Sequence, residues 1–262
     1  MRVVSLGKII LALLFLESCY SPQDGCLDTQ ASNYAINADR SCENCCQYPE
    51  LVFKMVHTMQ DSSFDATDTF VNNLGQRYSI LDVRFYLSGF LLKQQASDLK
   101  VREVITPSNT NLDITDDVVL WRSVDDEAVI GTVKAHGLFK GLYFNVGIDS
   151  AMLLNNYDNI QAGHPLSKEG KLKDIAGIPA WFYIKYVYYR PEPDIITLYI
   201  TKPFPKFPYT IDSLVQTTKG SPISYSIKAD YSQLLHPVDL NNSVDNIKNA
   251  VLGNLSELLI VK

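Results

Sequence analysis

The sequence predicts an all-β fold: an antiparallel β-sandwich with a short disulfide-rich N-terminal module and a C-terminal helix. From Leu51 onward, runs of alternating hydrophobic and polar residues are separated by turns rich in proline and polar residues. Fifteen Tyr and eleven Phe favour strands, because flat rings pack well on a pleated sheet. The β-α-β alternation of a parallel sheet is missing.

The expected strands follow one another along the chain, and each is justified by its period of two or by its apolar run. The first, Leu51–Met59, alternates strictly, and the second, Tyr78–Leu92, contains a bend at Ser88-Gly89. The others are Val118–Trp121, Ala128–Val133, Leu138–Ile148, Trp181–Tyr189, Ile195–Thr201 and Ile223–Ala229, with breaks at Pro191–Pro193 and Pro203–Pro208.

One helix is expected near the C-terminus. Ile247, Val251, Leu255 and Leu258 recur at helical spacing, and Asn242 and Ser243 precede them as candidate N-caps. We expect this helix to lie across one end of the sandwich.

The N-terminus predicts an exported lipoprotein. Positive residues flank the apolar run Ile9–Leu16, which is too short to span a bilayer and is typical of a signal peptide. The run ends in Leu16-Glu17-Ser18-Cys19, which resembles the lipobox of bacterial lipoproteins. We therefore expect a lipid on Cys19 that holds the protein outside the cytoplasm on a bacterial membrane, the outer membrane being our assignment.

Four further cysteines lie close together: Cys26, Cys42, Cys45 and Cys46. An even set in an exported chain predicts two disulfides. Adjacent Cys45 and Cys46 rarely bond to each other, so each is expected to reach Cys26 or Cys42, and both pairings stay open. Two metal alternatives are weaker: zinc on the thiolates, and calcium on oxygens of Asp24, Asp28, Asn33 and Asp39.

These features divide the chain into a signal peptide over residues 1–18, a Cys-rich module over 19–49 and a β-sandwich over 50–262. The module, with its Gly25-Cys26-Leu27-Asp28 start and Cys46-Gln47-Tyr48-Pro49 end, resembles one found in surface proteins of Bacteroidota. A net charge of −6 argues against a nucleic-acid partner, which needs a basic face.

No catalytic motif is present. The sequence lacks G-x-S-x-G, H-E-x-x-H, a P-loop and a Rossmann glycine pattern, and none of its four histidines stands out beside a nucleophile. We expect a protein that is not an enzyme.

Met55-x-His57-x-Met59 is the pattern most suggestive of a metal. Residues two apart on a strand share a face, and two thioethers with an imidazole suit Cu(I). Core packing of the two methionines explains the same pattern and is favoured on this pattern alone. Likewise, the aromatic run Trp181–Tyr189 could stack on sugars, but packing in a central strand is favoured.

Three stretches resemble the MbnP-like family, which is named for a bacterial copper-binding protein. Residues 83–92 (VRFYLSGFLL) are similar to its Y-Y-I-S-N-I pattern, and residues 142–149 (LYFNVGID) to its L-x-F-x-I-G-V-D strand. Residues 177–186 (GIPAWFYIKY) stand where the family has G-M-Y-W-S-W-x-x-G-Y, with Ala180 and Phe182 in place of its tryptophans.

The resemblance implies a β-sandwich that binds copper partly through histidine. It also implies a tryptophan that a partner di-haem peroxidase oxidises to kynurenine, for which Trp181 is the nearest candidate and Trp121 the other. His57 and His164 are the first ligands to test, with Met55 and Met59 beside His57. We expect a lipid-anchored, non-catalytic copper-binding protein; the alternatives are a cell-surface glycan-binding or other ligand-binding module and a structural accessory lipoprotein.

Overall fold

The computed structural model describes residues 21–42, 44–95, 97–101, 117–154, 160 and 162–261. The expected signal peptide and Cys19, the expected lipidation site, lie outside these residues. The chain divides into two compact units, residues 1–48 and residues 49–262. No helix in the described part of the chain is both long and apolar enough to cross a membrane.

The N-terminal unit contains little regular structure. Two short strands, β1 (Asp24–Gly25) and β2 (Arg40–Ser41), pair in parallel, and the rest is turns. Among its described hydrophobic residues, only Cys26 and Ala31 are buried. A unit with so small a core depends on covalent links.

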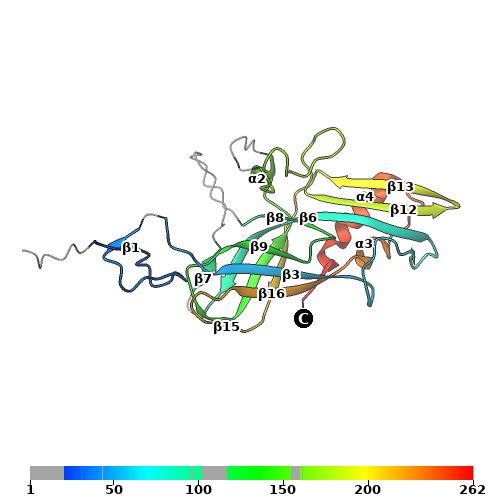
Figure 1. Ribbon diagram of the computed structural model, residues 1–262. Helices are drawn as coiled ribbons and strands as arrows, with labels where there is room; N and C mark the ends of the chain where they lie inside the picture. Colours follow the sequence, from blue (N-terminus) through cyan, green and yellow to red (C-terminus); the bar gives the residue numbers. More distant parts are fainter. Residues whose placement is uncertain are drawn as a thin grey trace, which may run out of the picture. The chain divides into compact units, whose positions relative to one another are not determined.

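The second unit is a β-sandwich (Figure 1), which confirms the predicted fold class. Its larger sheet has the order β13 (Glu192–Ile200), β12 (Phe182–Arg190), β6 (Arg77–Lys93), β11 (Gly141–Val146) and β14 (Phe207–Ile211). Three shorter strands also pair with β6: β5 (Phe70–Val71), β7 (Asp98–Lys100) and β8 (Val119–Arg122).

The smaller sheet has the order β17 (Leu259–Ile260), β16 (Ile223–Asp230), β3 (Glu50–Met59) and β4 (Ser62–Ser63), and β9 (Glu127–Thr132) also pairs with β3. Most pairs are antiparallel, but β3 and β16 run parallel. A separate short ladder joins β10 (Gly137–Phe139) to β15 (Val215–Thr217).

Aromatic contacts fill the space between the two sheets. The ring of Phe53 on β3 lies 5.8 Å from Phe90 on β6, 5.7 Å from Trp121 on β8 and 5.1 Å from Phe144 on β11. Edge-to-face pairs of this kind stabilise a core beyond the area they bury. Trp121 is therefore a core residue, fully buried.

The strand β6 connects two halves of the larger sheet. Residues 78–85 pair with β12 and residues 87–93 with β11, so the two neighbours succeed each other along one side of β6. At the junction, the Tyr86 N–H donates to the Trp181 carbonyl, and the Tyr86 carbonyl accepts from Gly147 N–H. Gly89, at the predicted bend, has a φ of 70°.

The C-terminal helix packs against the edge strand β13 of the larger sheet. The predicted helix is present as α4 (Val244–Asn254), which continues into the 3-10 turn η1 (Leu255–Glu257). Ser243 caps α4, because its side chain accepts a hydrogen bond from Asn246 N–H. Two short helices, α2 (Ser150–Leu154) and α3 (Ser232–Leu235), were not predicted.

Two strand predictions were wrong. The expected single strand Leu138–Ile148 is two strands, β10 and β11, because the chain changes partners at Lys140 and enters the larger sheet at Gly141. The Pro-rich stretch at 203–208, expected as a break, ends inside strand β14. Pro208 is tolerated there because β14 is the edge of its sheet, where a missing N–H costs no ladder bond.

Candidate metal site

The strand β3 carries Met55, His57 and Met59 on the face that points toward the opposite sheet, as their spacing predicts. Met55 and Met59 are 2% and 1% exposed and belong to the hydrophobic core. His57 is only half-buried. The two thioethers therefore fill core space, while the imidazole lies nearer the surface.

Both ring nitrogens of His57 have hydrogen-bond partners. Nδ1 lies 2.7 Å from the Tyr231 hydroxyl and Nε2 lies 2.8 Å from the Asp125 carbonyl oxygen. A carbonyl oxygen can only accept, so Nε2 carries the proton and Nδ1 accepts from Tyr231. The ring is thus assigned as the neutral tautomer with an acceptor at Nδ1.

Strand β16 and the ring of Phe64 position Tyr231. Tyr231 directly follows β16, which runs beside β3, and its ring is nearly parallel to that of His57. Phe64, just beyond β4, packs edge-on against Tyr231 at 4.9 Å. Burial raises the pKa of the Tyr231 phenol, so the hydroxyl stays protonated and can donate.

Asp125 supplies only its carbonyl to His57, because its side chain is engaged elsewhere. The carboxylate forms an ion pair with Arg122 at 2.7 Å and accepts from Arg122 N–H. This pair closes the turn between β8 and β9. A metal at His57 would therefore have to replace either the Tyr231 hydroxyl or the Asp125 carbonyl.

His164 lies in the loop before β12, in a different setting. Its side chain is 1% exposed, and its Nδ1 accepts a hydrogen bond of 3.0 Å from Leu166 N–H. Since Nδ1 accepts, the neutral ring carries its proton on Nε2, so a metal would have to displace the Leu166 N–H from Nδ1 or replace the Nε2 proton.

Tyr86 holds the His164 loop against the outer face of β6. Its hydroxyl donates to the Pro165 carbonyl at 3.0 Å and accepts from Leu172 N–H at 3.1 Å. Burial raises the pKa of this phenol, which keeps it protonated as the bond to Pro165 requires.

Trp181 is fully buried at the start of β12. Its indole N–H donates to the Pro203 carbonyl at 2.8 Å, and its ring packs against Phe182 and Phe207. An unmodified indole N–H is a donor only and offers no lone pair to a metal.

The predicted ligands thus fall into two groups. His57 contacts Tyr231 and the β8–β9 turn. Tyr86 instead links the other two residues: its hydroxyl donates to the carbonyl of Pro165, next to His164, and its N–H donates to the Trp181 carbonyl. Within the described ranges, no cluster of three or more His, Cys, Asp or Glu side chains is arranged to hold a metal.

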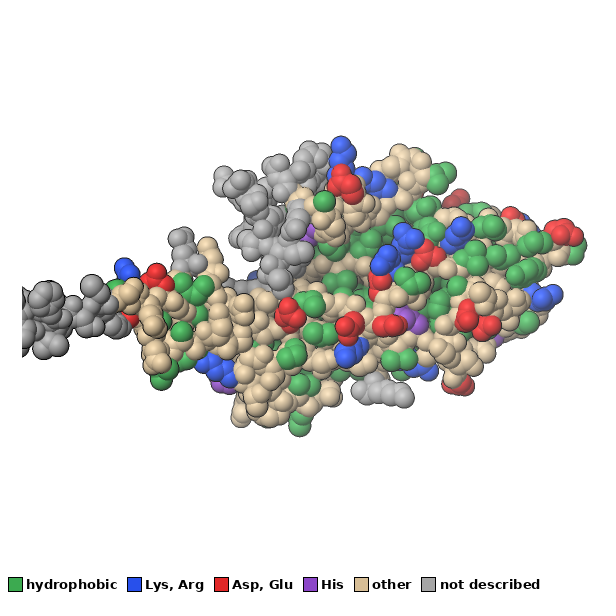
Figure 2. Space-filling view, in the orientation of Figure 1, with side chains coloured by type: hydrophobic (Ala, Val, Ile, Leu, Met, Phe, Trp, Pro, Cys, Tyr) green, Lys and Arg blue, Asp and Glu red, His purple; other side chains and the backbone are tan. Residues whose placement is uncertain are grey.

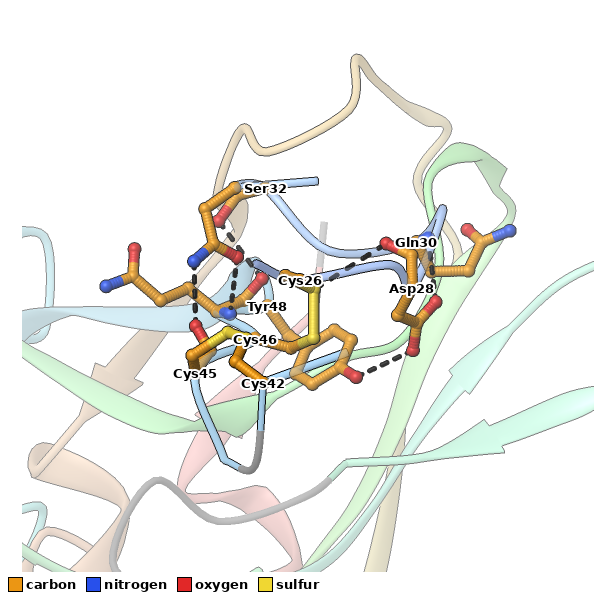
Figure 3. The surroundings of a disulfide bond; sticks show 10 residues. Cys26, Asp28, Gln30, Ser32, Cys42, Cys45, Cys46 and Tyr48 are labelled. Carbon is orange, nitrogen blue, oxygen red and sulfur yellow. Dashed lines mark hydrogen bonds between the residues drawn. A yellow bond between two sulfur atoms is a disulfide. The ribbon is translucent and has the colours of Figure 1, made fainter. Parts of the chain in front are cut away.

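The four described cysteines of the N-terminal unit form two disulfides. Cys26 bonds to Cys46 and Cys42 to Cys45 (Figure 3), which is one of the two pairings left open by the sequence. Thiols bonded in this way cannot hold zinc, and the disulfides indicate an oxidising compartment.

The oxygens considered for calcium have structural roles. Asp28 accepts from the Tyr48 hydroxyl and Gln30 N–H, Asn33 bonds to Cys45 O and Gln47 N, Asp39 accepts from Gln23 N–H, and Asp24 pairs with Arg40. These bonds stabilise turns of the module, as short polar side chains commonly do.

Three residues that matter here were not predicted from the sequence: Tyr231, Asp125 and Tyr86. Tyr231 is 174 positions from His57, and Asp125 is 68 positions away. No local pattern signals contacts at such separations.

Comparison with known proteins agrees with the motifs. Residues 48–173 match the model of the MbnP family. Among solved structures, MbnP from Methylosinus trichosporium is similar, with a TM-score of 0.47 and 11% sequence identity over 74% of this chain and 79% of that one. No protein of curated function matches the sequence. The part of the chain that matches the MbnP family is thus residues 48–173, which contain the first two of the three stretches that resemble it.

Proposed function

We propose that this chain is a copper-binding protein of the cell envelope, without catalysis of its own, that a lipid on Cys19 anchors to the membrane. The observation that carries the proposal is the MbnP-family match over residues 48–173, since the resemblance implies copper ligated partly by histidine. The two disulfides support a place outside the cytoplasm.

His164 is one candidate ligand. Its Nδ1 lone pair now accepts from Leu166 N–H, so copper would have to take the place of that donor. The Tyr86 hydroxyl bonds to its loop at Pro165, and the Tyr86 N–H bonds to the Trp181 carbonyl. Trp181 is the residue that the family resemblance singles out for oxidation by a di-haem peroxidase partner.

His57 is the second candidate. Its Nδ1 has a lone pair that now accepts from Tyr231, and copper could take that position if the phenol turned away. Met55 and Met59 share its face, and their soft sulfur atoms would favour Cu(I). In both cases the imidazole must be neutral, so copper binding weakens as the pH falls below about 6.

Copper titration of the full chain, purified from membranes in detergent, tests the proposal. His164→Ala and His57→Ala are compared with His136→Ala, which removes an exposed imidazole as a matched control. We expect the control to bind like the wild type and at least one of the first two variants to lose about tenfold or more in affinity, a usual cost of losing a ligand's support or the ligand itself. Equal binding by all three variants would exclude both candidate ligands.

The anchor and the partner have separate tests. Cys19→Ala should abolish incorporation of labelled fatty acid and release the protein from the membrane fraction. Treatment with a di-haem peroxidase and hydrogen peroxide should oxidise Trp181 in the wild type, which mass spectrometry of the tryptic peptides would detect.

A further inference from the structure

The outer face of the larger sheet carries a line of two arginines and two tyrosines, one from each of four adjacent strands. We call Arg122 (β8), Arg84 (β6), Tyr183 (β12) and Tyr199 (β13) the tyrosine–arginine row. Each is the register partner of the next: Arg122 of Arg84, Arg84 of Tyr183, and Tyr183 of Tyr199.

The row faces away from the core. The residues that alternate with it, such as Phe85, Phe182 and Ile200, are 0–1% exposed and point between the sheets. The side chains of Arg122 and Arg84 are 53% and 42% exposed. Over β6 and β12, Figure 2 shows positive and negative side chains next to each other within a broad area of hydrophobic ones.

The members of the row contact one another. The Arg84 guanidinium lies 5.3 Å from the centre of the Tyr183 ring, and the rings of Tyr183 and Tyr199 are 5.0 Å apart. Asp82, two positions from Arg84 on β6, pairs with Arg84 at 2.7 Å. These contacts hold the side chains in place before any ligand arrives, which lowers the entropy cost of binding.

The charge of this face differs from that of the whole chain. Arg84 is paired with Asp82 and Arg122 with Asp125, and Arg77 and Lys185 add two further positive charges on the same face of β6 and β12. The chain as a whole has a net charge of −6. A cationic, tyrosine-rich face on an acidic protein favours an anionic ligand with flat apolar surfaces.

We propose that the tyrosine–arginine row binds an acidic polysaccharide. Arginine recognises carboxylate or sulfate groups in a bidentate way, and tyrosine rings offer apolar faces on which the C–H faces of sugar rings can pack. Three steps between adjacent strands span about 14 Å, so a short run of sugar units fits across the row.

The two carboxylates distinguish this ligand from a nucleic acid. Asp82 and Asp125 can accept hydrogen bonds from sugar hydroxyls, which a polysaccharide offers along its whole length. A DNA phosphate backbone offers no such donors.

Affinity electrophoresis of the full chain tests the proposal, in EDTA so that copper plays no part. Polygalacturonate, alginate and chondroitin sulfate are the acidic probes; dextran, poly-glutamate and poly-dT are the neutral, acidic-peptide and nucleic-acid comparators. We expect retardation by at least one acidic polysaccharide and by none of the comparators, and weaker retardation as NaCl rises from about 0.05 to about 0.5 M.

Variants locate the site. Tyr183→Ala and Arg84→Gln should each weaken binding by about tenfold, as central Tyr and Arg residues of an interface commonly do. Arg190→Gln is the matched control, because Arg190 also pairs with an aspartate, Asp194, and lies 5.3 Å over a tyrosine ring, Tyr188, yet lies outside the row. Tyr183→Phe keeps the ring and should retain binding, which separates ring loss from misfolding.

Several results would overturn the proposal: no retardation by any of the three acidic polysaccharides, equal retardation by a comparator, or equal binding by Arg84→Gln and Arg190→Gln. A failed copper titration would leave it unaffected, since the assay contains no metal.

Discussion

The hydroxyl of Tyr231 donates a hydrogen bond to Nδ1 of His57 across 2.7 Å. The bond joins two neighbouring parallel strands, because Tyr231 follows β16 and His57 is in β3. It also occupies the one lone pair of the imidazole, since Nε2 donates to the Asp125 carbonyl. Tyr231 therefore competes directly with any metal at His57.

Tyr231→Phe is expected to have two opposite effects. Loss of the hydroxyl leaves the half-buried Nδ1 without its donor and destabilises the fold by about 1–3 kcal/mol. It also frees Nδ1, so copper affinity should rise if His57 is a ligand. Urea unfolding measures the first effect and copper titration the second; unchanged affinity would point away from His57.

Tyr225→Phe is the control for that variant. Tyr225 is buried on the same strand, β16, and its hydroxyl has no hydrogen-bond partner among the described residues. Removing an unpartnered buried hydroxyl is expected to be neutral or slightly stabilising. The same loss of stability in both variants would mean that the Tyr231 hydroxyl bond contributes nothing.

Tyr86→Phe should loosen the loop that carries His164. The change removes the donor to Pro165 O and the acceptor of Leu172 N–H, at a cost of about 1–3 kcal/mol. Trypsin should then cleave faster after Lys168 and Lys171, which lie between those contacts. Tyr186→Phe is the control, because its buried hydroxyl has no partner in the described structure.

If cleavage at these lysines is as slow in Tyr86→Phe as in Tyr186→Phe, the loop is held by other contacts. A rise in both variants would indicate a general loss of stability instead. Melting temperatures, measured on the same samples, separate the two cases.

Replacement of both Cys26 and Cys46 by serine should unfold the N-terminal unit alone. This disulfide closes a separation of 20 residues and contributes about 3 kcal/mol in the chain-entropy account, against about 2 for the three-residue separation of Cys42 and Cys45. Two-dimensional NMR should show collapsed signals for residues 21–48 and unchanged signals for the sandwich. A lower melting temperature of the sandwich would contradict this independence.

Much of the sandwich could be predicted, because the side-chain period of a strand is visible in the sequence. Strand β3 was expected at Leu51–Met59 and is Glu50–Met59, and the N-cap Ser243 was identified before α4. The alternation of hydrophobic and polar residues shows which face of a strand is buried, but not which strand lies beside it. The parallel pairing of β3 with β16, which brings Tyr231 to His57, was therefore out of reach.

The candidate site was predicted less well than the fold, for the same reason. The spacing of Met55, His57 and Met59 alone predicts that they share one face of a strand, and in the structure they do. The two partners of His57 come from a turn and a strand end far along the chain, where no period operates. The tyrosine–arginine row likewise depends on the order of four strands, which only the fold reveals.

Alkaline pH is expected to destabilise the protein through its buried tyrosines. Burial raises the pKa of Tyr209 to about 12 and that of Tyr225 to about 12, above the ordinary value of 10.0. The folded state thus holds these protons more tightly than the unfolded chain, so their stabilisation is complete below pH 10 and is lost as the pH rises from about 10 to about 12. Urea midpoints measured across this window should fall steadily.

In Tyr209→Phe the protein loses the bonds from the hydroxyl to the carbonyls of Leu255 and Ser256 and starts from a lower midpoint at neutral pH. Its decline above pH 10 should nevertheless be shallower, and shallower still with Tyr225→Phe added; an identical decline in the double variant would assign the alkaline loss to other groups.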